Sequence, residues 1–121
     1  MDLFGGTVLS CLFCGIVAGE VPSETVLESE QVVAFRDVSP AAPSHVLVVP
    51  REHIANAHEL GREHAQVLAE MIVAAQEVAR LEGIDTSGYR LVMNIGDDAL
   101  NSVPHLHLHV IGGRRMGWPP G

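Results

Sequence analysis

The feature that most constrains the fold is a strict alternation of histidine and leucine from His105 to His109. Successive side chains of an extended strand point to opposite faces, so a strand would place all three imidazoles on one face and both leucines on the other. The leucines would anchor the segment in a core while the histidines face a site. We therefore expect a strand over residues 103–111 that presents a row of imidazole rings.

Other segments predict four further strands. β-prone residues on both sides of the polar stretch 28–31 indicate a hairpin over residues 26–35. A buried strand is expected over 45–49, because Pro50 lacks the N–H donor that a ladder needs. The mixture of β-branched and aromatic residues over 89–95 indicates another strand before the glycine turn at Gly96.

One long helix is expected over residues 62–82. Apolar residues recur there at spacings of three and four, which defines one stripe of a helix: Ala65, Leu68, Ile72, Ala75 and Ala79. Gly83 supplies the stop. Five strands joined mainly by turns, with one helix inserted, predict an α+β fold in which the helix covers one face of an antiparallel sheet.

Composition limits the kind of partner. The 121 residues fit one domain over 11–121, with a loose N-terminal segment over 1–10. A net charge of −8 with no lysine argues against nucleic acid as a partner and excludes a Walker-type phosphate loop. We find neither a membrane-spanning apolar run nor a secretory signal, so we expect no membrane association and a cytoplasmic location.

The row of histidines favours phosphorus chemistry over metal chemistry. Neighbouring rings would stand roughly 6.6 Å apart and the outer two roughly 13 Å, which makes convergence on one small ion difficult. Such a row suits a substrate with a charged, oxygen-rich centre, where one ring attacks, a second donates hydrogen bonds and a third orients the first. His58 and His64 have no such partners, and we expect them at the surface.

Cys11 and Cys14 are the only cysteines, and two residues separate them. In a chain with no export signal this spacing is typical of a metal or redox pair rather than a structural disulfide. The spacing alone does not choose between the two.

The run from His105 to Val110 resembles the signature of the histidine triad (HIT) superfamily, and the tail 112–121 is similar to that of its Hint branch. Supporting matches lie at 35–40, 44–50 and 94–102, and the similarity extends from about Cys11 to the last residue. The resemblance implies a HIT-like fold: a five-stranded antiparallel sheet with one long and one short helix. It also implies a homodimer whose two sheets join into one of ten strands.

The resemblance further assigns roles to residues. His107 would attack the α-phosphorus of a purine nucleotide such as an AMP or GMP moiety, in a catalytic group with His109, His45 and His105. His109, Asn94 and Ser102 would hold the phosphate, and Asp37 would take the ribose hydroxyls. The base pocket would be lined by Phe13, Ile16, Phe35 and Val38. Trp118 would reach toward the site of the partner subunit. Bacterial relatives also imply a structural zinc, not required for the chemistry, on Cys11, Cys14, His53 and His105.

The chain departs from the Hint pattern in the loop before the triad. Where a glycine pair and glutamine are usual, it has Ala99, Leu100 and Asn101; Pro104 replaces an aromatic residue and Gly117 a histidine. A leucine does not readily adopt positive φ, so the N–H groups that would cradle phosphate could be aimed differently.

These observations predict a purine nucleoside phosphoramidate hydrolase that works through a nucleotidyl-His107 intermediate. A dinucleoside polyphosphate hydrolase would use the same attack on a longer leaving group. A nucleotide-binding regulatory protein with incidental catalysis is a third interpretation, and a metal hydrolase built on the triad is a more distant fourth.

Overall fold

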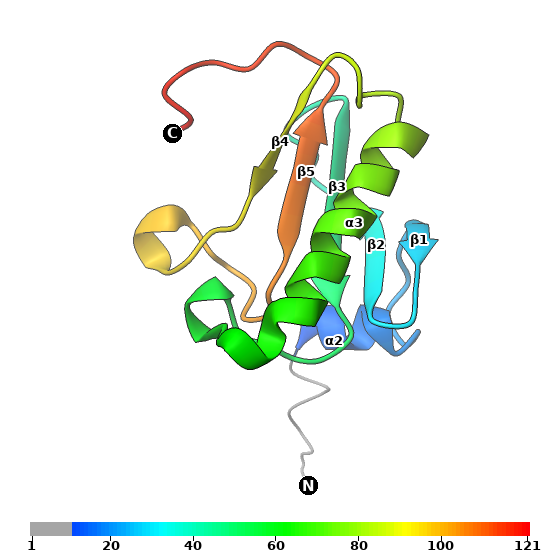
Figure 1. Ribbon diagram of the computed structural model, residues 1–121, viewed down its shortest axis with the longest axis vertical. Helices are drawn as coiled ribbons and strands as arrows, with labels where there is room; N and C mark the ends of the chain where they lie inside the picture. Colours follow the sequence, from blue (N-terminus) through cyan, green and yellow to red (C-terminus); the bar gives the residue numbers. More distant parts are fainter. Residues whose placement is uncertain (1–10) are drawn as a thin grey trace, which may run out of the picture.

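The computed structural model describes residues 11–121, so the predicted loose segment 1–10 lies outside the described residues. Five strands form one antiparallel sheet in the order β1-β2-β3-β5-β4, and the long helix lies across one face (Figure 1). The predicted α+β class is confirmed. The main elements in chain order are α2 (Leu12–Val17), β1 (Thr25–Glu28), β2 (Val32–Arg36), β3 (Ser44–Pro50), α3 (Ala65–Leu81), β4 (Tyr89–Val92) and β5 (Leu108–Gly112). Within residues 11–121, no helix has the length and apolar character needed to cross a bilayer.

Helix α3 buries a different stripe from the predicted one. A 3₁₀ turn over Arg62–His64 leads into α3, and Gly83 follows its end with φ 71°, as expected of a helix stop. Ala75 and Ala79 are buried as predicted, but Ala65 is exposed. The remaining buried positions are Val67, Met71, Ala74 and Val78. Two neighbouring apolar stripes share one spacing, so periodicity alone could not choose between them.

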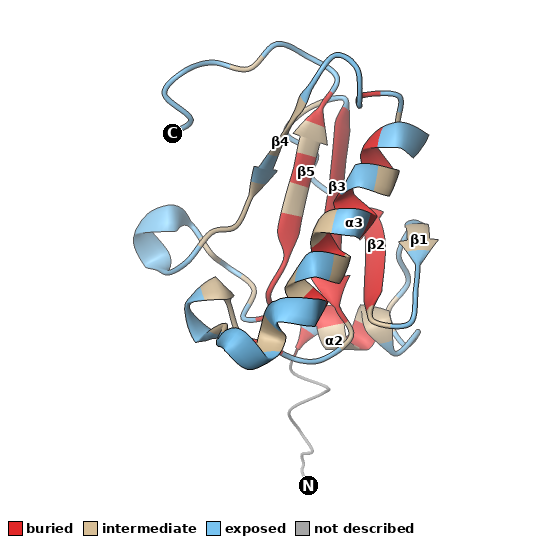
Figure 2. Ribbon diagram, in the orientation of Figure 1, coloured by how far each residue is buried: buried red, intermediate tan, exposed pale blue. Residues whose placement is uncertain are grey.

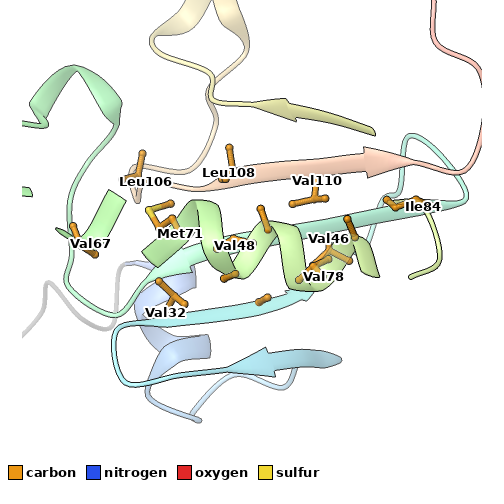
Figure 3. Close-up of a cluster of buried hydrophobic side chains, with 14 of the residues drawn as sticks. Val32, Val46, Val48, Val67, Met71, Val78, Ile84, Leu106, Leu108 and Val110 are labelled. Atoms are coloured by element: carbon orange, nitrogen blue, oxygen red, sulfur yellow. The ribbon is translucent and has the colours of Figure 1, made fainter. Parts of the chain in front are cut away.

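The main core lies between α3 and the sheet. Figure 3 shows Met71 and Val78 of α3 next to Val46 and Val48 of β3, and the buried positions colour this layer red in Figure 2. Leu106 and Leu108 are each 2% exposed and join the same cluster, as the alternating run predicted. The histidines between them therefore lie toward the opposite face of the sheet.

A second, smaller core covers that opposite face. It joins α2 to the sheet and consists of Cys11, Phe13, Val33, Phe35, Leu47 and Val49. The Sγ atom of Cys11 caps α2 by accepting a hydrogen bond from the N–H of Cys14 at 3.3 Å. A six-residue helix is too short to be stable alone, so α2 depends on these contacts with the sheet.

Two predicted strands are shorter in the structure. The strand expected over 89–95 ends at Val92, and the one expected over 103–111 begins only at Leu108. Pro104 has no N–H, and the N–H of His105 turns back to the carbonyl of Val103, so the ladder cannot start earlier. Leu106 instead donates to the carbonyl of Ile54. The alternation of faces survives although only His109 of the three histidines lies within β5.

A partly buried ion pair ties the end of α3 to the sheet. Arg36 donates to both carboxylate oxygens of Glu82, at 2.6 and 2.8 Å, and the hydroxyl of Ser44 donates to the same carboxylate at 2.8 Å. Arg36 also pairs with Glu24 at 2.8 Å. Because Asp37 follows Arg36 directly, this pair holds the chain where β2 enters the site described next.

Candidate active site

A pocket opens on the face of the sheet that the second core covers. Its wall comes from α2, the ends of β2 and β3, and the segment that leads into β5. The lining residues are Leu12, Phe13, Ile16, Pro22, Ser23, Phe35, Arg36, Asp37, Val38, Leu47, Ser102, Val103, His107 and His109. All of the predicted nucleotide contacts except Asn94 and Trp118 therefore lie in one pocket.

Aromatic rings form the apolar part of this wall. The rings of Phe13 and Phe35 meet edge to face with centroids 5.4 Å apart, and Phe13 meets the imidazole of His107 in the same way at 5.1 Å. The rings of His107 and His109 are 5.0 Å apart. The pocket thus combines an apolar aromatic wall with a pair of imidazoles.

Hydrogen bonding determines which nitrogen of His107 is free. Its Nδ1 lies 2.7 Å from the carbonyl oxygen of His105, and a carbonyl can only accept. In the neutral form of the ring, Nδ1 therefore carries the proton and Nε2 keeps its lone pair. His107 is 9% exposed and lines the pocket, so a lone pair on Nε2 would be available for attack at phosphorus.

A second chain of hydrogen bonds fixes the tautomer of His109. The backbone N–H of Ala41 donates to Nδ1 of His45 at 2.9 Å, so the proton of His45 is on Nε2. That Nε2–H donates in turn to Nδ1 of His109 at 2.8 Å. The proton of His109 must then lie on its Nε2, a buried atom with no hydrogen-bond partner among the described residues. His109 therefore carries an unused donor at a position that lines the pocket.

Both of these supporting histidines are neutral near pH 7. Burial, with the neighbouring His107 and His45, lowers the pKa of His109 from 6.5 to about 4. Burial also lowers the pKa of His45, against the opposing effect of Asp37, whose Oδ2 lies 3.4 Å from Nε2 of His45. Neutral rings are what the two tautomer assignments require.

The four predicted metal ligands meet in a second cluster beside the pocket. Nδ1 of His105 lies 3.4 Å from the sulfur of Cys11 and 3.4 Å from that of Cys14. Nδ1 of His53 lies 3.2 Å from the Cys14 sulfur and 3.2 Å from Nδ1 of His105. A tetrahedral zinc would hold two nitrogen ligands, or one nitrogen and one sulfur, about 3.3–3.6 Å apart, so the donor set and these four distances fit that ion.

The surroundings of this cluster also suit a metal. Nε2 of His105 lies 2.9 Å from the carbonyl of Pro50, which places the ring proton there and leaves Nδ1 free to bind an ion. Burial, followed by the hydrogen bond to Cys11, raises the pKa of Cys14 to about 11. A thiolate there would need a cation to stabilise it.

A second group of metal-binding residue types does not suit an ion. Asp37, His45 and His109 also bring their donor atoms within 4.8 Å of one another. A metal on Nε2 of His45 would require the ring proton on Nδ1, where the N–H of Ala41 already donates. The hydrogen-bond pattern therefore favours the cysteine-containing cluster as the metal site and the histidine pair as a proton-bearing one.

The loop before the triad corrects one expectation about its backbone. Leu100 adopts the left-handed conformation with φ 62° and ψ 35°, although its side chain is 84% exposed and gains nothing from burial. The turn is closed by hydrogen bonds from Leu100 to Asp97 and from Asn101 to Gly96. The loop thus keeps a glycine-like shape at leucine, at a cost in strain close to the pocket.

Two predicted contacts lie away from the pocket wall. Asn94 is half-buried just beyond β4, and Trp118 is 83% exposed with the guanidinium of Arg90 5.9 Å above its ring. His58 is exposed, as expected. His64, also predicted at the surface, is half-buried because its Nδ1 accepts the N–H of Gly61.

Several residues of the pocket wall were not predicted from the sequence. Leu47 carried a usable signal, because it follows His45 by two residues on a predicted strand and so shares its face. Pro22 and Ser23 carried none, since only the path of the chain after α2 brings them to the pocket.

The comparisons with known proteins agree with this geometry. The model of the HIT domain family matches residues 18–116. The purine nucleoside phosphoramidase of Escherichia coli K12 is 42% identical over 106 residues, covering 88% of this chain and 89% of the relative. A 14 kDa zinc-binding protein of Zea mays is 40% identical over 112 residues, covering 91% and 87%.

A solved HIT family hydrolase from Legionella pneumophila superposes with a TM-score of 0.90 at 43% identity, covering 93% of this chain and all of the other. The fold, the family model and these relatives agree with the histidine triad signature in the sequence. The chain belongs to the HIT domain family.

Proposed function

We propose that this HIT-family enzyme hydrolyses the bond between the α-phosphorus and the leaving group of a purine nucleoside phosphoramidate, through a nucleotidyl-His107 intermediate. The observation that carries the proposal is the pairing of opposite tautomers in one pocket. His107 has a free nitrogen lone pair, and His109 beside it has an unused N–H donor. One ring can attack phosphorus while the other stabilises charge on the phosphate oxygens.

In the first step Nε2 of His107 forms a bond to phosphorus as the phosphorus–nitrogen bond of the substrate breaks. The electron pair of that bond leaves with the amine, which takes up a proton. In the second step water attacks the same phosphorus and gives up a proton to solvent, the bond to Nε2 breaks with its electron pair returning to that nitrogen, and the nucleoside monophosphate departs. His109 donates to a phosphate oxygen in both steps, and the carbonyl of His105 keeps the proton of His107 on Nδ1.

The rest of the pocket suits a nucleoside. The aromatic edges of Phe13 and Phe35 and the aliphatic Ile16 offer an apolar slot for a flat base. Asp37 uses Oδ1 to accept the N–H of Ser39 at 2.8 Å, which keeps its carboxylate at the pocket wall as an acceptor for ribose hydroxyls. We expect the base to lie against Phe13, and Ser102 and Asn94 to assist at the phosphate.

Mass spectrometry after brief mixing with an adenosine phosphoramidate tests the intermediate. We expect one adenylyl unit on His107, and we expect His107→Ala to bind AMP yet lose turnover. His58→Ala, which changes an exposed histidine outside the pocket, should match the unchanged protein. Turnover retained by His107→Ala would end the proposal. Rates measured side by side on the phosphoramidate and on a dinucleoside polyphosphate distinguish the two candidate substrates. Low rates on every substrate would favour a regulatory role.

We infer that a structural zinc ion occupies the cluster of Cys11, Cys14, His53 and His105. The support is the ligand spacing of 3.2–3.4 Å and the orientation of the His105 ring. Two reduced cysteines at such a site suit the reducing cytoplasm, where we place the protein. Elemental analysis of protein purified without chelator should find about one zinc per chain, whereas two freely titrating thiols and no metal would refute the assignment.

We further propose a homodimer in which two sheets join edge to edge into ten strands. The support is that β4 lies at an edge of the sheet, with Leu91 38% exposed on it. Light scattering with size-exclusion chromatography should give twice the chain mass, and Leu91→Lys should lower it. A monomer at micromolar concentration would refute this arrangement.

A further inference from the structure

Helix α2 belongs to both the metal-binding cluster and the pocket. Cys11 and Cys14 are two of the four cluster ligands, and Leu12, Phe13 and Ile16 form part of the pocket wall. Phe13 lies between the two cysteines in the sequence. Its ring meets that of His105 at 6.1 Å and that of His107 at 5.1 Å. The same short helix therefore contacts a metal ligand and the nucleophile.

Apart from this cluster, α2 is attached to the sheet mainly through one side chain, that of Phe13 in the second core. The helix has six residues, and in isolation so short a segment would not stay helical. Phe13 is 5% exposed and packs in the second core, but Leu12 is 50% exposed and Ile16 is only half-buried. A metal ion bound by both cysteines would join α2 to His53 and to His105, at two separate places in the chain. No comparable link is made by the weak hydrogen bonds of two thiols.

We propose that metal occupancy of this cluster sets the affinity of the pocket for the base of a nucleotide. With the ion bound, α2 is held in place and its apolar side chains form a preformed wall for the base. Without the ion, α2 leaves the sheet for part of the time. The free energy needed to order α2 again then reduces the binding free energy of the base. The phosphate end depends on His107 and His109, which also have anchors outside α2: the core leucines beside them in the chain, the carbonyl of His105 and the ring of His45. The inference rests on the proposed nucleotide site and zinc ion.

The size of the effect follows from the docked population. The apparent Kd is the intrinsic Kd divided by the fraction of molecules in the competent state. If α2 is docked on the sheet in about one metal-free molecule in ten, the nucleotide binds about tenfold more weakly. AMP should show this loss. Ribose 5-phosphate has the sugar and phosphate but no base, so its affinity should change by less than about twofold.

His53→Gln is the informative variant. His53 is exposed, lies in the segment after β3, and neither belongs to α2 nor lines the pocket. The substitution removes one ligand of the cluster and disturbs nothing else that contacts the base. His58→Gln is the matched control, because His58 is also an exposed histidine in the same segment but is not a cluster ligand.

Calorimetry would measure AMP and ribose 5-phosphate binding to four full-length samples: zinc-loaded protein, protein stripped with a chelator that is then removed, His53→Gln and His58→Gln. We expect AMP to bind about tenfold more weakly to the stripped protein and to His53→Gln, and normally to His58→Gln. Hydrogen exchange adds a readout independent of ligand. The amides of Gly15 and Ala18, which bond to the carbonyls of Cys11 and Cys14, should exchange faster in the same two samples.

Equal AMP affinity in loaded and stripped protein would overturn the inference, as would unchanged exchange in α2. An equal loss for ribose 5-phosphate would also overturn it, because the cluster would then act on the whole site. Failure of loaded, unmodified protein to bind AMP at all has a different meaning and would overturn the proposed function itself. Absence of zinc from the loaded sample would overturn both the zinc assignment and this inference.

Discussion

Replacing Glu82 by alanine tests how firmly α3 is tied to the edge of the pocket. The carboxylate is 11% exposed and receives two hydrogen bonds from Arg36 and one from Ser44. Breaking a fully buried ion pair costs about 3–5 kcal/mol. Here the loss is smaller, because the Arg36 side chain is 39% exposed and keeps Glu24 as a partner. We expect the free energy of unfolding to fall by about 2–3 kcal/mol.

Thermal and urea unfolding measure this loss. A domain of this length gains about 0.25 kcal/mol/K of unfolding entropy at its midpoint, so the midpoint should fall by about 10 °C. The control is Glu77→Ala, which removes an ion pair with Arg80 on the same helix in which the two side chains are 40% and 61% exposed. The free energy of unfolding of that variant should change by no more than an ordinary surface substitution changes it. A loss at Glu82 no larger than at Glu77 would refute the reasoning.

The effect should also depend on pH. Arg36, through its hydrogen bonds, holds the pKa of Glu82 below its usual 4.5, with Ser44 adding to the shift and burial opposing it. A carboxyl with a lowered folded-state pKa stabilises the protein above its unfolded pKa and loses that contribution as the pH falls through the folded value. The difference between the unchanged protein and Glu82→Ala should therefore be full at pH 7 and should shrink below about 4.5. A difference that stays constant down to pH 3 would contradict an electrostatic origin.

Three further predictions concern the site. The pKa of His109 is lowered to about 4, so between pH 6.5 and 4 this ring binds a proton in the unfolded chain but not in the folded protein. Stability should therefore decline as the pH falls from 6.5 towards 4. His109→Asn should remove that part of the decline in a urea titration, and an identical pH profile would contradict it. His45→Leu removes the donor that fixes the tautomer of His109 and should lower kcat by on the order of tenfold, with AMP affinity little changed. Recovery in His45→Gln would support the positional role, whereas an equal loss of binding would oppose it. Leu100→Gly removes the strain of a left-handed leucine but raises the conformational entropy of the unfolded chain. Thermal unfolding should therefore show a gain in stability of at most about 1 kcal/mol. A clear loss of stability would show that the loop is unstrained.

Much of the site follows from local sequence. The alternation from His105 to His109 predicted that the two leucines enter the core and that His107 and His109 face the pocket, because neighbouring side chains on an extended chain point to opposite faces. Leu106 and Leu108 are buried accordingly. The alternation did not predict that His105 is fully buried in the cysteine cluster and does not line the pocket. The α+β class, the hairpin and the stop at Gly83 followed from patterns only a few residues long.

Tertiary structure decided what local patterns leave open. The buried stripe of α3 is set by the sheet that it meets, since two stripes of equal spacing were available. The tautomers of His107 and His109 depend on the carbonyl of His105 and on a hydrogen bond that begins at Ala41, 68 residues away from His109 along the chain. Pro22 and Ser23 reach the pocket only through the path of the folded chain. Hydrogen bonds and packing between distant segments depend on three-dimensional position, whereas the face and the periodicity of an element are properties of the local backbone.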